Sequence, residues 1–299
     1  MVNRNIESRA WQWAGHSILL VYAAACVLPF LLLLTSSVTD ESTIIKNGYS
    51  FFPEKFSLEA YRYLWNESTD ILRAYGITVF VTVVGTTLSL AITSMLAYPI
   101  SRRDLPYRNP LAFYVFFTML FNGGLVPTYF VFTQVFDMKN SLAALLIPAL
   151  LMNGFNVLLM RTFFMTTIPP AVLESAKMDG AGEIRIFYSI VLPLSTPIMA
   201  TIGLFQAIAY WNDWFNGLIY ITDPKLFSLQ NILNRIMSDI QFLSTNAAMS
   251  ARASESMMTL PSASFRMAIV VVGVIPILLA YPFFQKYFVK GITIGAVKG

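Results

Sequence analysis

The sequence of 299 residues is poor in charge, in histidine and in cysteine. Charged residues form 12% of the chain and hydrophobic residues 56%, whereas an ordinary soluble domain carries about 25% charged residues. So few charges cannot cover this apolar content with a polar surface, which excludes an ordinary soluble fold. The composition indicates a protein that lies in a membrane.

The chain contains one cysteine, Cys26, and one histidine, His16. No disulfide can form within it, and the zinc-binding pattern His-Glu-x-x-His is absent. Because Cys26 has no base beside it and Asp213 alone supports no mechanism, the sequence argues against a membrane-embedded enzyme. The run Ala23–Cys26 also matches the end of a lipoprotein signal, but apolar residues continue to Leu34, which favours an uncleaved membrane span.

The sequence also lacks the phosphate-binding loop Gly-x-x-x-x-Gly-Lys-Ser/Thr. Any ATP that drives this protein is therefore expected on another polypeptide, and we expect no cofactor on this chain. The formal net charge is +4, but the basic residues form no dense run, so the charge does not indicate nucleic acid as a partner.

Six apolar runs are long enough to cross a hydrocarbon core of about 30 Å, which takes about 20 helical residues. The predicted spans are residues 16–37, 77–100, 111–136, 142–164, 194–221 and 267–288. These runs are too long and too uniformly apolar for barrel strands, and open sheet edges cannot face lipid. We therefore predict an all-α, polytopic membrane helical bundle with six transmembrane helices, in which residues 1–299 form a single transmembrane domain.

The distribution of Lys and Arg predicts orientation, because these residues are retained on the cytoplasmic side of short loops. With the N-terminus inside, the predicted cytoplasmic segments carry eleven basic and five acidic residues. The remaining segments carry nine basic and eleven acidic residues. This asymmetry places both termini on the cytoplasmic side of the membrane, in agreement with an even number of spans.

Two segments are predicted on the external side. Residues 56–65 place apolar side chains at helical spacing after Ser57, a residue type that favours the N-cap. We expect a short surface helix there, which either packs on the mouth of the bundle or docks an external partner. Residues 222–265 form a longer external loop, whose helical stretch Leu229–Ile240 is a candidate cap over the external mouth of the bundle.

Two further features modify the predicted spans. In the second span, small residues recur every four positions, at Gly85, Ser89, Thr93 and Ala97. Such a row lets another helix approach closely, so we interpret it as a packing surface rather than a pore lining. The third span is interrupted by residues 122–127, Asn-Gly-Gly-Leu-Val-Pro, which either face the interior or form a simple kink.

A charged segment, residues 167–193, separates the fourth and fifth spans. Ile168–Pro170 favours a helix start, and Asp179–Gly180 favours a sharp turn after that helix. A second short helix is expected to end at Pro193, with Ile184, Phe187 and Ile190 on one apolar side. On periodicity alone, an interfacial hairpin that only anchors the bundle fits slightly better than a rigid knob that binds a partner.

The order of residues in this segment resembles the EAA motif of permease subunits from ATP-binding-cassette (ABC) importers, which reverses that preference. The matching residues are Glu174, Ala176, Asp179, Gly180, Ala181, Phe187, Leu192, Pro193 and Pro197. Ser175 replaces the usual alanine, exchanging one small residue for another. The resemblance implies the type I importer permease fold, also called MetI-like, with residues 167–193 as a cytoplasmic coupling segment.

In that family the motif sits in a groove of the ATPase subunit and transmits closure of the ATPase dimer to the membrane helices. The resemblance thus implies an ATPase-coupling site formed by Glu174, Ser175, Ala176, Asp179, Gly180, Ala181, Ile184 and Phe187. It also implies a second permease subunit, expected to be a different chain, two ATPase subunits that hold ATP and Mg²⁺, and an external solute-binding protein.

Residues 56–65, 209–217 and 281–299 resemble the carbohydrate-importing branch of these permeases, and the ending 290–299 is similar to the group for complex oligosaccharides and polysaccharides, including alginate-type importers. Aromatic faces in 209–217 can meet the C–H faces of a pyranose, while its amide and carboxyl groups supply hydrogen bonds. Trp and Tyr also anchor membrane interfaces, which is a purely structural alternative. The candidate substrate pathway consists of Asn122, Tyr210, Trp211, Asn212, Asp213, Trp214 and Asn216.

Two other transport functions stay open at this point. The chain can be an ABC permease for a non-sugar solute, or an ion-coupled carrier that works alone. A carrier would ordinarily place ionisable groups within its spans, and Asp213 is the main acidic candidate. In every case we expect membrane lipid around the chain, and we expect no catalytic residue and no metal site on it.

Overall fold

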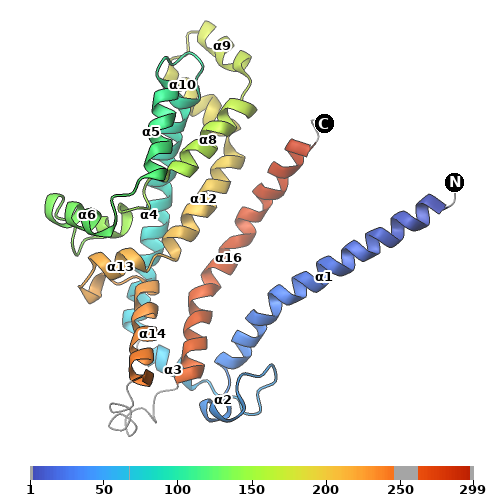
Figure 1. Ribbon diagram of the computed structural model, residues 1–299, viewed down its shortest axis with the longest axis vertical. Coiled ribbons are helices and arrows are strands. Elements are labelled where there is room, and N and C mark those ends of the chain that lie inside the picture. Colours follow the sequence, from blue (N-terminus) through green and yellow to red (C-terminus); the bar gives the residue numbers. More distant parts are fainter. Residues whose placement is uncertain (1–2, 67, 246–261, 297–299) are drawn as a thin grey trace. The chain divides into compact units, whose positions relative to one another are not determined.

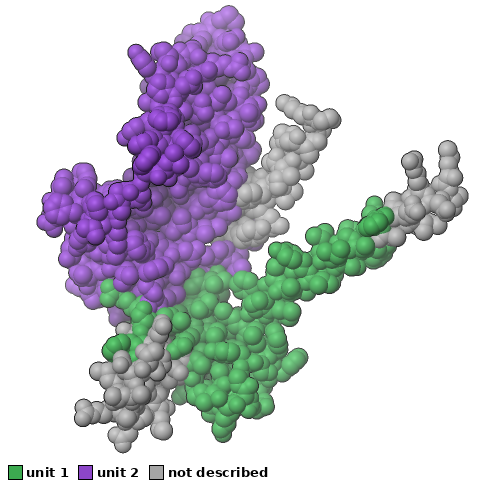
Figure 2. Space-filling view, in the orientation of Figure 1, with its two compact units in different colours: residues 1–69, 235–275 green, residues 70–234, 276–299 purple. Residues whose placement is uncertain are grey.

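The computed structural model describes residues 3–66, 68–245 and 262–296. The regular elements of these residues are helices, and their one strand-like pairing is an isolated antiparallel bridge between Thr39 and Phe56. The chain divides into two compact units (Figure 2). Residues 1–69 and 235–275 form the first unit, and residues 70–234 and 276–299 form the second.

The first unit contains α1 (Asn3–Ser37), α2 (Glu41–Asn47) and α3 (Glu59–Asn66), together with parts of α14 (Leu229–Thr245) and α16 (Ser262–Ala296). The apolar stretch Trp11–Ser37 of α1 has almost no buried side chains within the chain. Such a surface suits lipid rather than water, because a soluble protein rarely exposes a long apolar patch.

Carboxylates organise the loop region of this first unit. Asp40 caps α2 by accepting a hydrogen bond from the backbone N–H of Ser42, and it pairs with Lys55 at 2.9 Å. Glu41 accepts hydrogen bonds from the backbone N–H groups of Ala263 and Ser264 at 2.8 and 2.9 Å, which satisfies donors at the start of α16.

The short surface helix predicted from residues 56–65 is confirmed as α3. The hydroxyl of Ser57 accepts a hydrogen bond from the backbone N–H of Glu59 at 3.2 Å, as expected for a residue that favours helix starts. Its role, packing or docking, stays a prediction. The helix predicted within Leu229–Ile240 is also confirmed, and it extends to Thr245 as α14.

The second unit is a bundle in which α4, α5, α8 and α12 run alongside one another, with α9 and α10 at one end (Figure 1). Its elements are α4 (Ser68–Ser101), α5 (Arg108–Leu120), α6 (Leu125–Phe130), the π-helix η1 (Val131–Val135), α7 (Leu142–Leu146), α8 (Gly154–Thr167), α9 (Pro170–Met178), α10 (Glu183–Ile186), the π-helix η2 (Phe187–Val191), α11 (Leu192–Leu194), α12 (Thr196–Trp211), α13 (Phe215–Tyr220) and the 3₁₀ turn η3 (Pro224–Leu226).

The row of small residues on α4 packs against α12, as the four-residue spacing predicts. Ser89, Thr93 and Ala97 are fully buried. A Cβ atom at Gly85 would overlap the ring of Tyr210, and Ser89 accepts a hydrogen bond from the amide of Gln206. Because these positions carry no large side chains, the two backbones approach closely. This row is therefore a packing surface and not a pore lining.

Three of the predicted spans are broken. Helix α5 and the run α6–η1 meet at 110°, with the break at residues 121–124. Gly124 adopts φ +88°, and its backbone N–H donates to the Asn122 side chain at 2.8 Å. Glycine permits this conformation, and the side-chain bond replaces a helical one, so the break predicted in the third span is confirmed.

The fourth and fifth spans were expected to be continuous, and this is wrong. Helix α7 ends at Leu146, Pro148 follows, and α8 starts only at Gly154 after a cap by Asn153. Helix α12 ends at Trp211, and Asp213 accepts a hydrogen bond from the backbone N–H of Asn216 at 3.2 Å. Proline removes a helical donor, while Asn and Asp compete for backbone groups, so each run breaks where these residues occur.

By length and composition, two helical segments are long and apolar enough to cross a membrane, Trp11–Ser37 and Thr69–Ser101. The number rises to five if each of three bent pairs counts as one span. Within the described residues the predicted number of six is therefore not confirmed.

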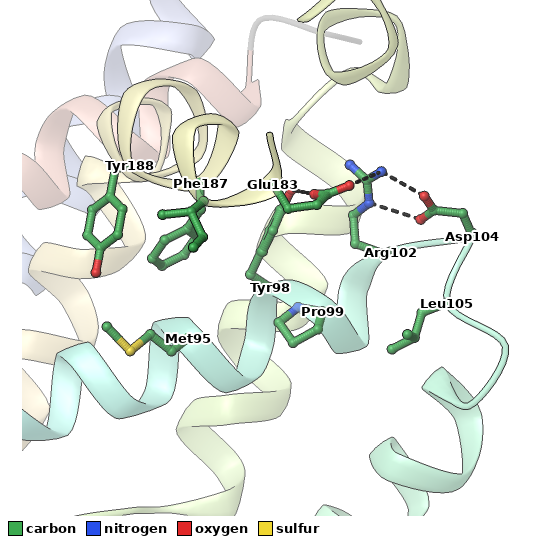
Figure 3. A pocket seen from close by; sticks show the side chains of 10 residues that line it. Met95, Tyr98, Pro99, Arg102, Asp104, Leu105, Glu183, Phe187 and Tyr188 are labelled. Atoms are coloured by element: carbon green, nitrogen blue, oxygen red, sulfur yellow. Dashed lines mark hydrogen bonds and ion pairs between the residues drawn. The ribbon is translucent and has the colours of Figure 1, made fainter. Parts of the chain in front are cut away.

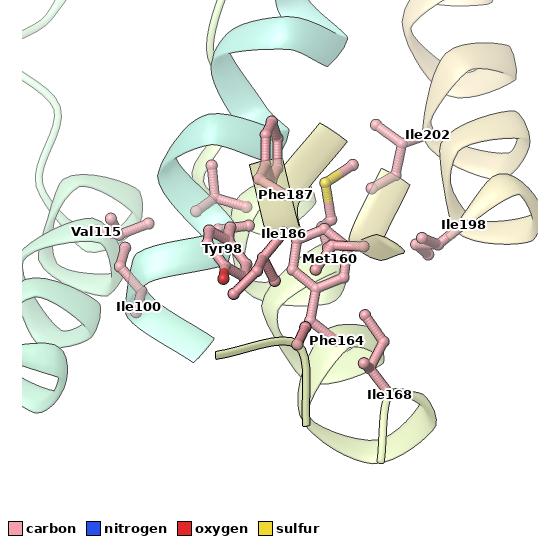
Figure 4. Packing of buried hydrophobic residues seen from close by; sticks show 14 residues of the cluster. Tyr98, Ile100, Val115, Met160, Phe164, Ile168, Ile186, Phe187, Ile198 and Ile202 are labelled. Carbon is pink, nitrogen blue, oxygen red and sulfur yellow. The ribbon is translucent and has the colours of Figure 1, made fainter. Parts of the chain in front are cut away.

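Two clusters of buried side chains hold the second unit together. The first lies where α9 and α10 meet the bundle (Figure 4). It contains Ala97, Tyr98, Ile100, Val115, Val157, Met160, Phe164, Ile168, Ala176, Ile186, Phe187, Val191, Ile198 and Ile202. The second contains Val81, Ala144, Leu145, Tyr210, Tyr220 and Ile221.

Candidate coupling site

The candidate coupling site is the hairpin formed by α9 and α10. Helix α9 begins at Pro170, which stands at the first helical position, where a missing N–H costs nothing. It ends at Met178, and Gly180 adopts φ +78°. The predicted helix start and the predicted turn are therefore confirmed.

The turn after α9 has the hydrogen bonds of a Schellman motif. The backbone N–H of Ala181 donates to the carbonyl of Ala176 at 3.0 Å, and that of Gly180 donates to Lys177 at 3.0 Å. These bonds satisfy carbonyl groups that the end of a helix otherwise leaves free, and they require a left-handed residue at Gly180. The turn thus gives the hairpin a fixed geometry.

The hairpin has an outer face and an inner face. Glu174, Ser175, Asp179 and Gly180 are exposed. Ala176 is buried in the first cluster, and Leu173 and Ala181 pack against that cluster. Small residues on the inner side let α9 lie close to the bundle, while carboxylates on the outer side are available to a partner.

The second arm of the hairpin carries its predicted apolar residues at different depths. Phe187 is buried, whereas Ile184 is 76% exposed, and both line one cleft. The buried face contains Ile186, Phe187 and Val191, and Ile184 lies at its edge in the first turn of α10.

Pro193 does not end this arm, contrary to expectation. The backbone N–H of Leu192 bonds to the carbonyl of Phe187, five residues back, and the helix continues through Pro193 to Leu194. Proline is tolerated in the first turn of a helical segment. The π-helix η2 ends directly before α11, so Pro193 lies in the first turn of α11.

Four charged side chains, Arg102, Asp104, Lys177 and Glu183, form what we call the charge cluster. Figure 3 shows Arg102, Asp104 and Glu183 of this cluster. Arg102 and Asp104 follow α4, Lys177 belongs to α9, and Glu183 opens α10. Arg102 donates two hydrogen bonds to Asp104, at 3.0 and 2.8 Å. Lys177 reaches Asp104 at 2.9 Å and Glu183 at 2.8 Å.

Tyr98 connects this cluster to the apolar core. Its hydroxyl donates to Glu183 at 2.7 Å, its ring packs against Phe187, and the guanidinium carbon of Arg102 lies 5.8 Å from its centroid. Arg161 of α8 makes a further contact with α4. Its Nε donates a hydrogen bond to the carbonyl of Ile100 at 3.2 Å and so caps the end of α4.

These contacts shift the pKa values of the cluster. Hydrogen bonds from Arg102 and then Lys177 hold the pKa of Asp104 well below its usual range. Partial burial alone would raise the pKa of Glu183, but hydrogen bonds from Lys177 and Tyr98 leave it lowered. Glu183 and then Asp104 raise the pKa of Lys177. All four groups are therefore charged at neutral pH.

A cleft of about 620 Å³ opens beside the charge cluster. Its walls are mostly apolar (Figure 3). The lining residues are Met95, Tyr98, Pro99, Arg102, Asp104, Leu105, Glu183, Ile184, Phe187 and Tyr188. The cleft thus lies between α10 and the end of α4. Arg102, Asp104 and Glu183 of the charge cluster form one of its walls.

The candidate substrate residues are not all alike in placement. Tyr210 is buried and its hydroxyl donates to the carbonyl of Leu146 at 2.8 Å, and the Asn216 amide donates to Pro148 at 3.0 Å. Trp211 is buried, with its ring 6.3 Å from that of Tyr75.

Asn122, Asn212 and Trp214 are exposed, and Asp213 is half-buried. The structure therefore gives Tyr210, Trp211 and Asn216 packing contacts within the chain, while Asn122 lies at a separate bend between α5 and α6. A role of any of these residues in substrate transfer stays a prediction.

Sequence reasoning missed the charge cluster and the polar contact between Gln206 and Ser89. The available signal was the charged run Arg102–Asp104 directly after an apolar span. Nothing local links it to Lys177, because Asp104 and Lys177 are 73 positions apart.

Apolar bent helices with an exposed hairpin of fixed geometry at one end fit a membrane component of a transport system. The chain belongs to the family of binding-protein-dependent transport system inner membrane components, whose family model matches residues 106–294. This range includes the whole hairpin. Membership confirms the family predicted from the EAA-like segment, and it establishes a membrane-embedded subunit of a transport system.

Relatives of known description cover nearly the whole chain. It is 40% identical over 295 residues to the polygalacturonan/rhamnogalacturonan transport system permease protein YtcP of Bacillus subtilis (strain 168), over 98% of this chain and 100% of that protein. Protein LplC of the same organism is 38% identical over 276 residues, covering 92% and 90% of the two chains.

A solved structure is similar in fold along the same length. It is the crystal structure of a bacterial ABC transporter involved in the import of the acidic polysaccharide alginate. One of its chains matches with a TM-score of 0.79 and 27% identity, over 94% of this chain and 98% of that chain. The predicted MetI-like permease fold is therefore confirmed, although the number of spans is not.

Proposed function

We propose that this chain is the transmembrane permease subunit of an ATP-driven importer for a carbohydrate of the oligosaccharide or polysaccharide class. The observation that carries this proposal is 40% identity over 98% of the chain to a polygalacturonan/rhamnogalacturonan transport permease. Similarity to a chain of the alginate importer supports the same class of cargo.

In this proposal the outer face of the α9–α10 hairpin binds an ATPase subunit. Glu174, Ser175, Asp179 and Gly180 form the contact surface, and Ile184 adds an exposed apolar side chain. The inner side, with Ala176, Ala181 and Phe187, passes the motion to the bundle. ATP drives the change of access because it binds more tightly to the closed ATPase state than to the open one.

The remaining partners follow from the same proposal. A second permease subunit, a different chain, completes the translocation pathway, and an external solute-binding protein delivers the sugar. Two ATPase subunits hold ATP and Mg²⁺. Six spans with both termini in the cytoplasm put the hairpin on the ATPase side of a bacterial cytoplasmic membrane, which fits the excess of basic residues in the predicted cytoplasmic segments.

The substrate pathway is proposed to use residues near the breaks in α5–α6 and α12–α13. Asn122, Asn212 and Trp214 are exposed at these breaks, and Asp213 is half-buried. Breaks of this kind occur at membrane depth where backbone groups line a cavity. The buried residues Tyr210, Trp211 and Asn216 are proposed to support that surface.

The test is ATP-dependent uptake into vesicles reconstituted with the complete transporter. Fragments of polygalacturonan, rhamnogalacturonan and alginate serve as cargo, and an amino acid serves as the non-sugar comparison. We expect uptake of one saccharide when ATP is supplied on the side of the membrane where the ATPase subunits lie. We expect this uptake to be lost in the variant Gly180→Val. Unchanged uptake in that variant would refute the coupling role of the hairpin.

The main rival is an ion-coupled carrier that works alone. It predicts uptake by the purified chain without ATPase subunits, driven by an ion gradient, and a strong dependence on Asp213. The importer predicts no uptake under those conditions. Import of the amino acid with no import of any saccharide would assign the chain to a non-sugar ABC permease.

A further inference from the structure

We propose that the charge cluster is a positioning device that fixes α9 to the cytoplasmic end of α4, so that movement of the hairpin moves α4. This inference rests on the proposed coupling function, and it adds residues outside the EAA-like segment. The positioning residues are Arg102, Asp104, Lys177 and Glu183, with Tyr98 as their anchor.

Lys177 is the centre of this connection. Its ammonium group lies 2.9 Å from Asp104, which follows α4, and 2.8 Å from Glu183, the first residue of α10. One side chain of α9 therefore contacts both the segment after α4 and the start of α10. Because Lys177 occupies the last turn of α9, its positive charge also suits the negative end of the helix dipole.

Arg102 makes the other side of the connection rigid. Its side chain is 12% exposed and donates two parallel hydrogen bonds to Asp104. The same guanidinium lies 3.5 Å from the carboxylate of Glu183. Bidentate pairs of this kind fix direction as well as distance. Tyr98 adds a third restraint by donating to Glu183 and by packing on Phe187 in the core.

The apolar contacts of α9 could not supply this restraint alone. Its buried side chain is Ala176, and Leu173 is half-buried against the core. Apolar burial is non-directional, so small side chains hold two elements together but permit sliding. An apolar cleft beside α10 leaves that arm without close packing along one side, which makes the directed bonds of the charge cluster more important.

Helix α4 is suited to carry the motion. It is continuous from Ser68 to Ser101, which corresponds to about 50 Å of helix. At its far part, the hydroxyl of Thr78 accepts a hydrogen bond from the backbone N–H of Leu229, and Gly85 packs under Tyr210. A displacement imposed at Arg102 thus reaches the start of α14 through one continuous helix.

The experiment uses the complete transporter in vesicles, with Lys177→Met and Asp104→Asn as test variants. Uptake per ATP hydrolysed is expected to fall by at least about fivefold in both, the lower range of coupling between sites, while the ATPase subunits stay bound. Lys177→Arg keeps both ion pairs and should restore the ratio. Arg73→Met is the matched control, because it removes an exposed ion pair of α4 outside the cluster.

A distance measurement separates positioning from general stability. Spin labels at Met178 and Tyr107, which are 84% and 69% exposed, are introduced in a Cys26→Ser background. Lys177→Met should broaden the distance distribution between them, and Arg73→Met should not. A narrow distribution, an unchanged uptake per ATP, or loss of the ATPase subunits from the Lys177→Met complex would each overturn the proposal.

Failure of the inference differs from failure of the proposed function. If the wild-type complex shows no ATP-dependent uptake, the proposed function is refuted. If the wild type transports and Gly180→Val does not, but Lys177→Met transports with normal uptake per ATP, the coupling function stands and the positioning role of the charge cluster is refuted.

Discussion

At the residue scale, Gly180 sets the exit angle of α9. Its φ of +78° is left-handed, and a Cβ placed there meets no atom within 4 Å, so the cost of replacing it is backbone strain alone. We expect Gly180→Val to destabilise the hairpin by about 1–2 kcal/mol, the usual cost of this conformation for an L residue. Gly180→Asn should cost less, because Asn tolerates it.

Hydrogen exchange of the amides of Gly180 and Ala181 checks this prediction, since both donate in the turn. Faster exchange is expected in Gly180→Val than in Gly180→Asn, with the amides of α4 unaffected. Identical exchange in the two variants would mean that left-handed strain does not decide the stability of the turn.

Asp104 predicts how the charge cluster responds to acid. Hydrogen bonds from Arg102 and Lys177 lower its pKa in the folded protein. Its stabilising contribution is therefore complete above the unfolded value of about 3.9, and it is lost as the pH falls toward the lower folded value. Lys177 has a raised pKa, so its contribution is complete below about pH 10.4 and is lost at higher pH.

Thermal unfolding of the purified protein in detergent tests this plateau. The difference in midpoint between wild type and Asp104→Asn should be constant from about pH 5 to 8 and should shrink below about pH 4. A difference that already changes between pH 8 and 5 would show that another titrating group controls the cluster.

At the element scale, contact between α4 and α12 depends on Gly85. A Cβ there would overlap the ring of Tyr210, whereas Gly76 of the same helix has open space around it. Gly76→Ala should be neutral or stabilising by up to about 1 kcal/mol, because alanine favours helix. Gly85→Ala should instead destabilise by about 1–3 kcal/mol, because it overpacks the contact.

Denaturant or thermal titration of both variants in detergent gives the comparison. The two changes are chemically identical and lie in one helix, so helix propensity cancels between them. Equal stability of Gly85→Ala and Gly76→Ala would show that α4 and α12 can separate without cost.

Local chemistry explains which elements were predictable. Pro170 starts α9 and Gly180 ends its turn, and each acts through its own backbone, so both were readable from the sequence. The small-residue row on α4 was readable because its spacing matches a helix face. The burial of Phe187 and the exposure of Ile184 were not, because a π turn and the neighbouring helices decide them.

The charge cluster shows the limit of sequence reading for the site. Tyr98 and Glu183 are 85 positions apart, and Asp104 and Lys177 are 73 apart. Nothing in either charged run indicates its partner, since exposed Lys and Glu residues are common on any cytoplasmic loop. The folded bundle is needed to bring the end of α4 beside α9.

At the scale of the whole molecule, hydropathy predicted the membrane class but not the helix breaks. The apolar content of a segment determines whether it can lie in lipid. Whether its helix is continuous depends instead on its backbone hydrogen bonds. Pro148 and Asp213 interrupt those bonds without lowering the average hydropathy of their runs enough to show. In the third predicted run, the bent pair of α5 with α6–η1 replaces a straight span. The fourth and fifth predicted runs are divided between α7 and α8 and between α12 and α13.

The proposed topology makes a prediction about the two sides of the membrane. Met178 at the end of α9 and Phe52 in the loop after α2 are 84% and 86% exposed, so a cysteine at either position is open to reagents. With Cys26→Ser as background, Met178→Cys should react with a membrane-impermeant maleimide only from the cytoplasmic side. Phe52→Cys should react only from outside, because one span separates it from a cytoplasmic N-terminus. Labelling of both from the same side of intact cells would refute the proposed topology, and the hairpin would then lose its access to a cytoplasmic ATPase.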